Sequence, residues 1–532
     1  MTVRWPVSVQ EHRSDTVAPN ASHSGALLSG AMPRARVHKR LTVSQRKASH
    51  GLVTLLTLAH LTSASFATDA QPPPDAAEQD EFRQRLTERE DKLRTAQPLQ
   101  IDVAGRPLTL SGEVGFDLEQ LRRPASAGTA PHRDHSRTFV LEAEAFYSIN
   151  TTFALFAQMR LEQARQRGAS AQGGSTHYAE RGEMWLYGKS IAGSEMNVEL
   201  GRLKFDDDRR WWWDQELDAA RLSYESDGVE VAMAFARELA RNRTHRSSVE
   251  PERYRVGRWL TYAKWDWAPD QELSFVALRQ DDRSAIDSPG QIIADRERDE
   301  SDARLTWLGA GVAGKVTLAG RGVLSYTIDS ASVRGSERLS QFDPRPAQTS
   351  VVSDVTRRDV RGWALDAGLR WTAAAALAPR VFVAYAYGSG GVMSQGADRS
   401  FRQTGLQKNE SGFGGVKRFE HYGAALDPEL SNLRITTLGA GLSPAKWSSI
   451  DLVYHHYRQV SPATSLRTAR FSTDLTGSHR DIGTGFDFVA AIKGWKRIEL
   501  SAIASTFRSG AAFAAQAGRT YTFGTLEFRV AF

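Results

Sequence analysis

The sequence predicts an all-β protein, a transmembrane antiparallel β-barrel of about 18 strands with short periplasmic turns and long extracellular loops. From about residue 106 to the end, apolar and polar residues alternate, in segments of roughly ten residues. Short and long polar connections separate these segments in turn. Mean hydropathy is −0.43 and no apolar run is long enough for a membrane helix, so spanning helices are excluded whereas barrel strands are not.

The first 67 residues predict a cleavable export signal. A basic run at 34–47 precedes the apolar run 52–61, and the small residues Ser65 and Ala67 place cleavage after Ala67. A buried helix is the alternative interpretation. Residues 1–31 exceed an ordinary leader, so Met32 is an alternative start of the chain.

Residues 68–105 predict a periplasmic N-terminal segment. A proline-rich stretch at 72–74 is followed by a charged, glycine-free run that ends near Ala96 and indicates a short solvated helix. Binding of a partner protein is the alternative role for this segment.

The charge balance argues against a nucleic-acid partner. The net charge is +6, but residues 1–67 hold eight Lys or Arg and two Asp or Glu, which leaves 60 basic and 60 acidic residues in the remainder. The exported chain is therefore neutral and lacks a basic footprint. It has no cysteine, which excludes disulfides, thiolate metal sites and cysteine nucleophiles.

The predicted strands follow from the alternation and from the turn residues between them. They are 106–118, 137–148, 152–163, 179–188, 195–204, 218–225, 229–239, 255–267, 271–281, 301–310, 315–327, 360–373, 379–389, 433–443, 447–459, 481–493, 496–508 and 518–532. Tight links after every second strand, as at residues 226–228 and 268–270, predict periplasmic turns on one side only. An even strand number returns both ends to the periplasm.

Two strands show a lipid face most clearly. In 360–373, Trp363 and Trp371 lie at the two ends of an apolar row, as in an aromatic girdle. In the last strand, Phe528 and the terminal Phe532 share the lipid face. A C-terminal aromatic residue resembles the signal read by the barrel-assembly machinery, so that machinery and outer-membrane lipid are expected partners.

The more polar strand faces predict a lumen lined by both signs of charge. Paired Arg and carboxylate ladders that stiffen the wall are the alternative to substrate contact. Arg202 and Lys204 reach the lumen only if a bulge at Gly201 reverses the alternation. The predicted lumen residues are Glu142, Glu144, Arg160, Glu162, Arg221, Glu225, Lys264, Asp266, Arg304, Arg321, Asp366, Arg370, Arg497, Glu499, Glu527 and Arg529.

No enzymatic motif is found, and no cofactor or metal is expected. His455 and His456 are adjacent on a strand and point to opposite faces, so the pair cannot chelate. Asp206, Asp207 and Asp208 could bind a cation, with a solvated loop as the alternative. No G-x-S-x-G motif supports a hydrolase.

Several segments resemble the alginate-export outer-membrane porin family. They are WALDAGLRW at 363–371, YGSGG at 387–391, QTGLQKNESGF at 403–413 and ELSNL at 429–433, with weaker similarity in EMWLYG at 183–188 and GRLKF at 201–205. The resemblance implies an 18-stranded barrel that exports an anionic polysaccharide through an arginine-rich constriction.

Under this resemblance, Arg202 and Arg418 match constriction arginines. The sequence departs from the family pattern in three places. Glu142 replaces an arginine, the arginine pair of strand 17 falls near Ser501 and Ile503, and the long periplasmic plug is reduced to residues 493–495.

These observations predict a porin in the outer membrane of a Gram-negative bacterium that passes an anionic or neutral exopolysaccharide, or another polar solute. Periplasmic export proteins are candidate partners. The long connection 390–432, loop 7, is expected to fold into the lumen and narrow it. Changing Arg202 and Arg418 together to Ala is expected to shift the ion preference toward cations. A general or substrate-uptake porin is the alternative, and an adhesin or anchor is a third hypothesis.

Overall fold

The structure is a computed structural model that describes residues 83, 92–95, 97–125, 131–168, 174–284, 288–391, 396–471 and 474–532. The predicted export signal lies outside the described residues. So does most of the predicted charged helix. Arg83 is described and helical, but residues 92–95 are described without regular secondary structure, so the predicted helix is wrong for them. Among the described residues, no helix has the length and apolar character needed to cross a bilayer.

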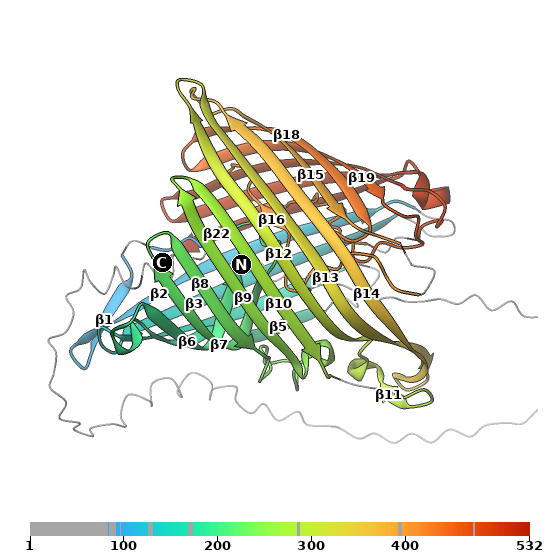
Figure 1. Ribbon diagram of the computed structural model, residues 1–532, viewed down its shortest axis with the longest axis horizontal. Coiled ribbons are helices and arrows are strands. Elements are labelled where there is room, and N and C mark those ends of the chain that lie inside the picture. Colours follow the sequence, from blue (N-terminus) through green and yellow to red (C-terminus); the bar gives the residue numbers. More distant parts are fainter. Residues whose placement is uncertain are drawn as a thin grey trace, which may run out of the picture. The chain divides into compact units, whose positions relative to one another are not determined.

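Eighteen antiparallel strands form one closed barrel, as the sequence predicted (Figure 1). Each strand pairs with its neighbours in the chain, and the first pairs with the last from Glu113↔Ala531 to Arg122↔Thr522. Closure leaves no unpaired edge, which the bilayer requires. The barrel strands are β2 (Arg106–Arg123), β3 (His132–Ser148), β4 (Phe153–Arg167), β5 (Ser175–Gly188), β6 (Met196–Asp206), β7 (Asp214–Ser226), β8 (Val229–Ala236), β9 (Val256–Ala268), β10 (Gln271–Asp282), β12 (Ser301–Leu318), β13 (Gly322–Arg345), β14 (Thr349–Thr372), β15 (Arg380–Gly388), β18 (Leu433–Ala445), β19 (Ser448–Gln459), β20 (Asp481–Trp495), β21 (Ile498–Ser509) and β22 (Thr520–Ala531).

In the described part of the chain, four short strands and four 3-10 turns lie outside this ring. β1 (Leu99–Val103) pairs with the periplasmic start of β2, and β11 (Ile292–Ala294) pairs with β14. β16 (Glu410–Ser411) and β17 (Phe419–Glu420) form a separate two-stranded sheet within loop 7. The 3-10 turns are η2 (Ile191–Gly193), η3 (Pro251–Arg253), η4 (Asp295–Glu297) and η5 (Ala511–Gln516).

The predicted turn near residues 311–314 is wrong, and the predicted strands 301–310 and 315–327 shift accordingly. β12 continues through these glycine-rich residues, and the chain turns at 319–321. The glycines make room for lumenal side chains: a Cβ on Gly309 would lie 2.1 Å from Cζ2 of Trp212. Beyond the membrane, β13 and β14 also extend as a long hairpin where a loop was expected.

The outer face of the barrel is apolar, as predicted. Trp363, Leu369 and Trp371 of β14 are exposed on one face, whereas Ala364 and Asp366 on the other face are buried. Phe528 of β22 and Phe532 are likewise exposed. Exposed apolar rows on a closed barrel form the surface that contacts lipid.

Candidate functional site

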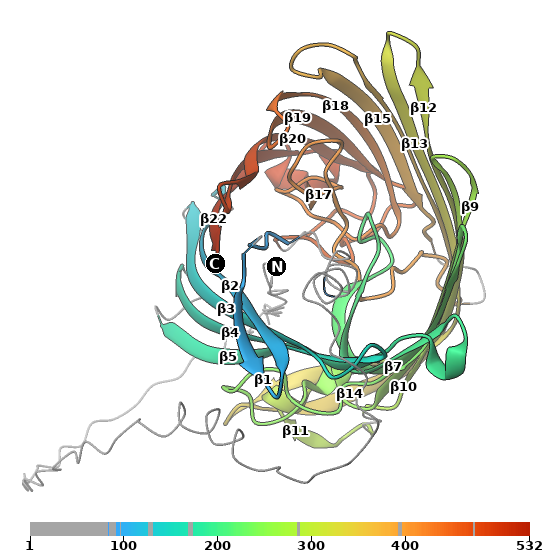
Figure 2. The ribbon, with the colours of Figure 1, turned by 90° about the vertical axis from the view of Figure 1, so that its left-hand side faces the viewer.

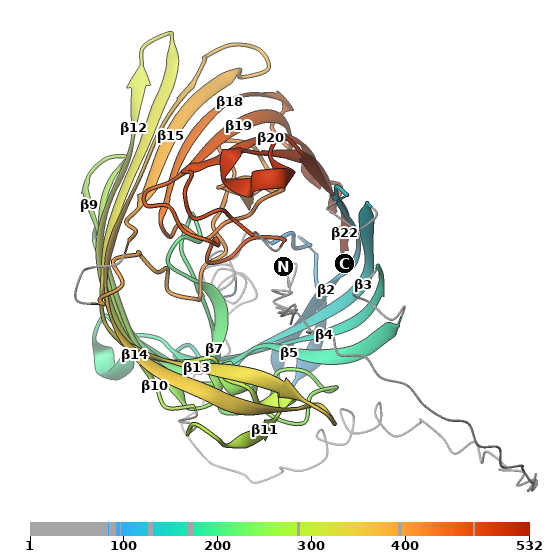
Figure 3. The same ribbon diagram turned by 90° about the vertical axis from the view of Figure 1, so that its right-hand side faces the viewer.

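Loop 7 folds into the barrel and crosses its interior, which confirms the expectation from its length. Figures 2 and 3 look into the ring of strands and show orange loop segments inside it. Trp307 Nε1 of β12 donates to the Arg402 carbonyl at 2.7 Å, and Tyr457 OH of β19 donates to the Tyr422 carbonyl at 2.8 Å. On β20, Asp487 Oδ2 accepts the Ala424 amide at 3.2 Å. The loop is therefore fixed to separate strands of the wall.

The connection between β6 and β7, loop 3 (residues 207–213), meets loop 7 inside the barrel. Asp207 accepts backbone amides from Trp211, Trp212 and Trp213 at 2.9–3.1 Å, which fixes the turn. Burial raises the pKa of Asp207 to about 6. The Asp207 carboxylate is thus engaged by its own loop, whereas Asp208 next to it is exposed.

A central ion-pair cluster joins the two loops to the opposite wall. Arg209 of loop 3 lies 2.7 Å from Asp329 of β13 and 2.6 Å from Asp366 of β14. Tyr422 OH donates to Asp366 at 2.6 Å and accepts the Trp211 indole N–H at 2.7 Å. His421 Nε2 accepts from Arg209 at 2.8 Å. Burial and the adjacent guanidinium lower the pKa of His421, so its ring is neutral and able to accept.

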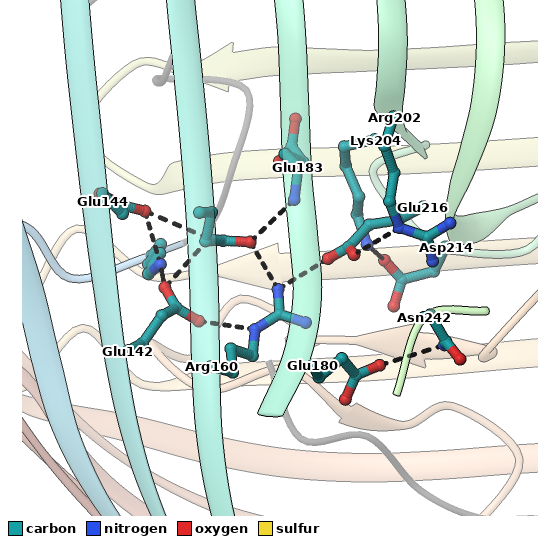
Figure 4. Close-up of polar contacts among 12 residues, drawn as sticks. Glu142, Glu144, Arg160, Glu180, Glu183, Arg202, Lys204, Asp214, Glu216 and Asn242 are labelled. Carbon is teal, nitrogen blue, oxygen red and sulfur yellow. Dashed lines mark hydrogen bonds and ion pairs between the residues drawn. The ribbon is translucent and has the colours of Figure 1, made fainter. Parts of the chain in front are cut away.

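Besides this central cluster, a row of ion pairs runs along the lumenal face of β3 to β7 (Figure 4). Arg160 of β4 joins Glu142 of β3 at 2.7 Å to Glu216 of β7 at 2.6 Å. Arg202 of β6 lies 3.5 Å from Glu216 and 3.7 Å from Asp218. Such a row matches the wall-stiffening alternative considered above, since each charge is buried beside an opposite one.

The row ends at loop 7. Lys204 pairs with Asp214, which also lies 2.7 Å from Lys408 of loop 7. Arg210 of loop 3 pairs with Glu410 of loop 7 and lies 3.5 Å from Asp214. Ion pairs around Asp214 and Glu410 therefore join strand β6 to the two constricting loops.

Arg202 and Lys204 lie in the lumen, as predicted, but without the expected bulge at Gly201, because β6 pairs with both β5 and β7 without a register shift there. Gly201 has φ +135°, and a Cβ there would lie 2.2 Å from the Met184 carbonyl oxygen. Leu200 is 47% exposed on the outside, whereas Arg202 is 3% exposed. The alternation of the strand thus reverses at this glycine.

The remaining predicted pore cations line two cavities beside the loops. Arg221 and Arg418 line the first, of about 350 Å³, together with Lys204. Arg221 pairs with Glu199 and donates to the Lys204 carbonyl at 3.1 Å. Arg370 lines the second, of about 730 Å³, and donates to Ser325 Oγ at 3.2 Å. Among the described residues, Arg370 has no carboxylate at ion-pair distance.

A model of the alginate-export family matches residues 114–526. The chain belongs to the alginate-export family. It is 26% identical over 318 residues to the alginate production protein AlgE of Pseudomonas aeruginosa, covering 59% of this chain and 63% of that protein. It is 28% identical over 299 residues to AlgE of Azotobacter vinelandii, covering 52% and 58%. The matched part is therefore less than two thirds of either relative.

The fold is also shared with a solved crystal structure. The crystal structure of Acinetobacter baumannii OccAB2 aligns at a TM-score of 0.50 and 12% identity, over 80% of this chain and 98% of that chain. Family and fold place this member of the alginate-export family in the outer membrane of a Gram-negative bacterium. The family is one of barrel channels and not of enzymes.

Three residues that were predicted to line the lumen of this family member do not line it. Arg321 is exposed in the periplasmic turn 319–321, because the chain reverses there and not at 311–314. Arg497 lies in the turn before β21 with φ +68°. Arg304 lies on the exposed face of β12 that also carries Leu308, opposite Trp307, and pairs with Asp281 at 3.2 Å. His455 and His456 do point to opposite faces, as predicted: His455 is buried, whereas His456 is only partly buried.

Several lumenal cations were missed because they lie outside strands, where alternation carries no information. Arg209, Arg210, Lys408 and Lys417 come from the two loops, and each pairs with an acid distant in sequence. The length of loop 7 and the adjacent Arg209 and Arg210 were the sequence features that could have indicated lumenal cations in the loops. For Lys92 and Arg94, which precede the barrel, no sequence feature indicated a position in the lumen.

Proposed function

We propose that this alginate-export family member passes an acidic polysaccharide of the alginate type through its lumen and across the outer membrane. The observation that carries the proposal is the joint lining of the 350 Å³ cavity by aromatic and cationic side chains. Trp185 and Trp212 line it together with Arg221 and Arg418.

This combination suits a sugar acid. An indole ring has a polar N–H beside a large apolar face, which fits the mixed surface of a pyranose ring. Guanidinium groups bind carboxylates through two parallel N–H donors. Trp185 stacks on Phe156 at a centroid distance of 5.1 Å, which holds its ring in place.

A general or uptake porin without polymer specificity is the second candidate. The ion-pair row favours it, because Arg160 and Arg202 are buried between carboxylates and contribute little net positive potential. The two candidates differ in whether an acidic polymer is preferred. The barrel-assembly machinery and periplasmic export proteins are proposed partners in either case.

Efflux from proteoliposomes tests the proposal. Vesicles containing the purified protein are loaded with labelled mannuronate oligomers or with neutral dextran oligomers of matched size. The proposal predicts faster release of the mannuronate. Equal release, or faster release of dextran, favours the general porin.

A further inference from the structure

We propose that Lys92 and Arg94, which precede the barrel in the sequence, are pore residues that set the charge of the lumen beside β3. They supply the positive charges opposite Glu142 and Glu144. The part of this inference that concerns a polymer rests on the proposed function, whereas the part that concerns small ions does not.

The contacts place both side chains in the lumen. Lys92 Nζ pairs with Glu142 and lies 2.6 Å from Glu144 Oε1. Arg94 Nε lies 3.2 Å from Glu144 Oε2, and Arg94 also lines the cavity that contains Trp212 and Arg418. Both glutamates are buried on the lumenal face of β3.

The topology explains why this segment enters the barrel. β1 pairs with β2 from Val103↔Arg106 to Leu99↔Leu110. Beyond that point the same edge of β2 is occupied by the C-terminal strand, with Gly112 and Phe532 exchanging backbone hydrogen bonds. The chain before Leu99 therefore cannot continue along the sheet. Figure 2 shows the blue trace before β1 crossing the inside of the ring.

The local charge requires these cations. Glu142 and Glu144 are two residues apart on one face of a strand, so their like charges are close together. Arg160 is shared between Glu142 and Glu216, and Glu216 also pairs with Arg202. These two arginines match the charges of Glu142 and Glu216, whereas Glu144 pairs with Lys92 and Arg94. Without Lys92 and Arg94 this level of the lumen would repel anions, in a narrow channel where charges act strongly.

The cations of the N-terminal segment lie opposite an acidic part of the barrel wall. Glu142 and Glu144 make this part of the wall acidic. Cations delivered from the N-terminal segment restore a balance that the wall lacks. Lys92 and Arg94 thereby become specificity-determining residues from outside the strands.

The test is the reversal potential of the full-length protein in planar bilayers under a salt gradient. In K92A/R94A we expect the anion-to-cation permeability ratio to fall roughly three- to tenfold, tenfold corresponding to about 1.4 kcal/mol. The matched control R321A/K496A removes one Arg and one Lys from periplasmic turns and should leave the ratio unchanged.

A second variant covers the case in which K92A/R94A does not assemble. E142Q/E144Q should raise the ratio, and adding it to K92A/R94A should return the ratio toward that of the wild type. An unchanged ratio in either variant, or an equal change in the control, would overturn the inference. Mannuronate efflux measured in parallel tests only the proposed function. If the ion ratio changes but mannuronate is not preferred over dextran, the proposed function fails, whereas Lys92 and Arg94 still determine ion selectivity.

Discussion

Arg209 of loop 3 and Asp366 of β14 lie 2.6 Å apart, Nη2 to Oδ1, in the interior of the barrel. Asp366 is fully buried and also accepts the Tyr422 hydroxyl of loop 7. One ion pair thus links both constricting loops to the wall. Because long loops without their own core depend on such anchors, the width of the lumen depends on this pair.

Arg209→Ala is expected to widen the channel and lower stability. Removing one partner of a buried pair leaves Asp366 and Asp329 without their guanidinium, at a cost of roughly 3–5 kcal/mol. We expect a lower thermal unfolding midpoint and a higher single-channel conductance. Arg296→Ala, which removes a highly exposed arginine, is the control. An unaltered conductance in Arg209→Ala would show that the pair does not hold the constriction.

Gly201→Val tests the glycine at which β6 turns Arg202 and Lys204 inward. The new Cβ would lie 2.2 Å from the Met184 carbonyl, at φ +135°, so the strand must rearrange. We expect a loss of roughly 1–3 kcal/mol of stability. Gly174→Ala, where a Cβ has open space, should have little effect. Similar unfolding midpoints for the two variants would exclude a special role for Gly201.

Deleting Phe532 should impair assembly more than conduction. The residue exchanges two backbone hydrogen bonds with Gly112, at 2.9 and 3.0 Å, at the seam that closes the barrel. Its ring is exposed on the lipid face. We expect a reduced yield of heat-modifiable folded protein in outer membranes, with normal conductance for the channels that form. Leu526→Ala on the same face is the control, and a normal yield for the deletion would refute the prediction.

The sequence predicted the wall of the barrel far better than its interior. Alternation identified the strands because each residue of a spanning strand faces either lipid or lumen. The glycines of β12 predicted a turn, but Gly309 lies within the strand, where the absence of a side chain leaves room for the Trp212 ring. Ion pairs such as Lys417 with Glu527 join residues 110 positions apart, and no local pattern reports them. Lys92 and Arg94 enter the lumen only because β22 occupies the edge of β2, which is a property of the closed fold.

Asp207 should make stability depend on pH. Burial raises its pKa to about 6 in the folded protein, from about 3.9 in an unfolded chain. Its contribution is therefore fully present below about pH 4 and is lost as the pH rises through about 6. We compare the thermal unfolding midpoints of the wild type and Asp207→Asn. The difference, wild type minus variant, should fall between about pH 4 and pH 6 and stay constant above about pH 7. A difference independent of pH would contradict the assignment.

The most direct test of the account is block of single channels by acidic and neutral oligosaccharides. Arg418 of loop 7 lines the same cavity as Trp185 and Trp212. Mannuronate oligomers should interrupt the current at concentrations roughly tenfold lower than neutral oligomers of equal length, since each bidentate contact to a carboxylate contributes on the order of 1.5–3 kcal/mol. In Arg418→Ala this preference should shrink while block by neutral oligomers stays constant. Equal block of the wild type by both oligomers would contradict an acidic polysaccharide as the molecule that this lumen passes.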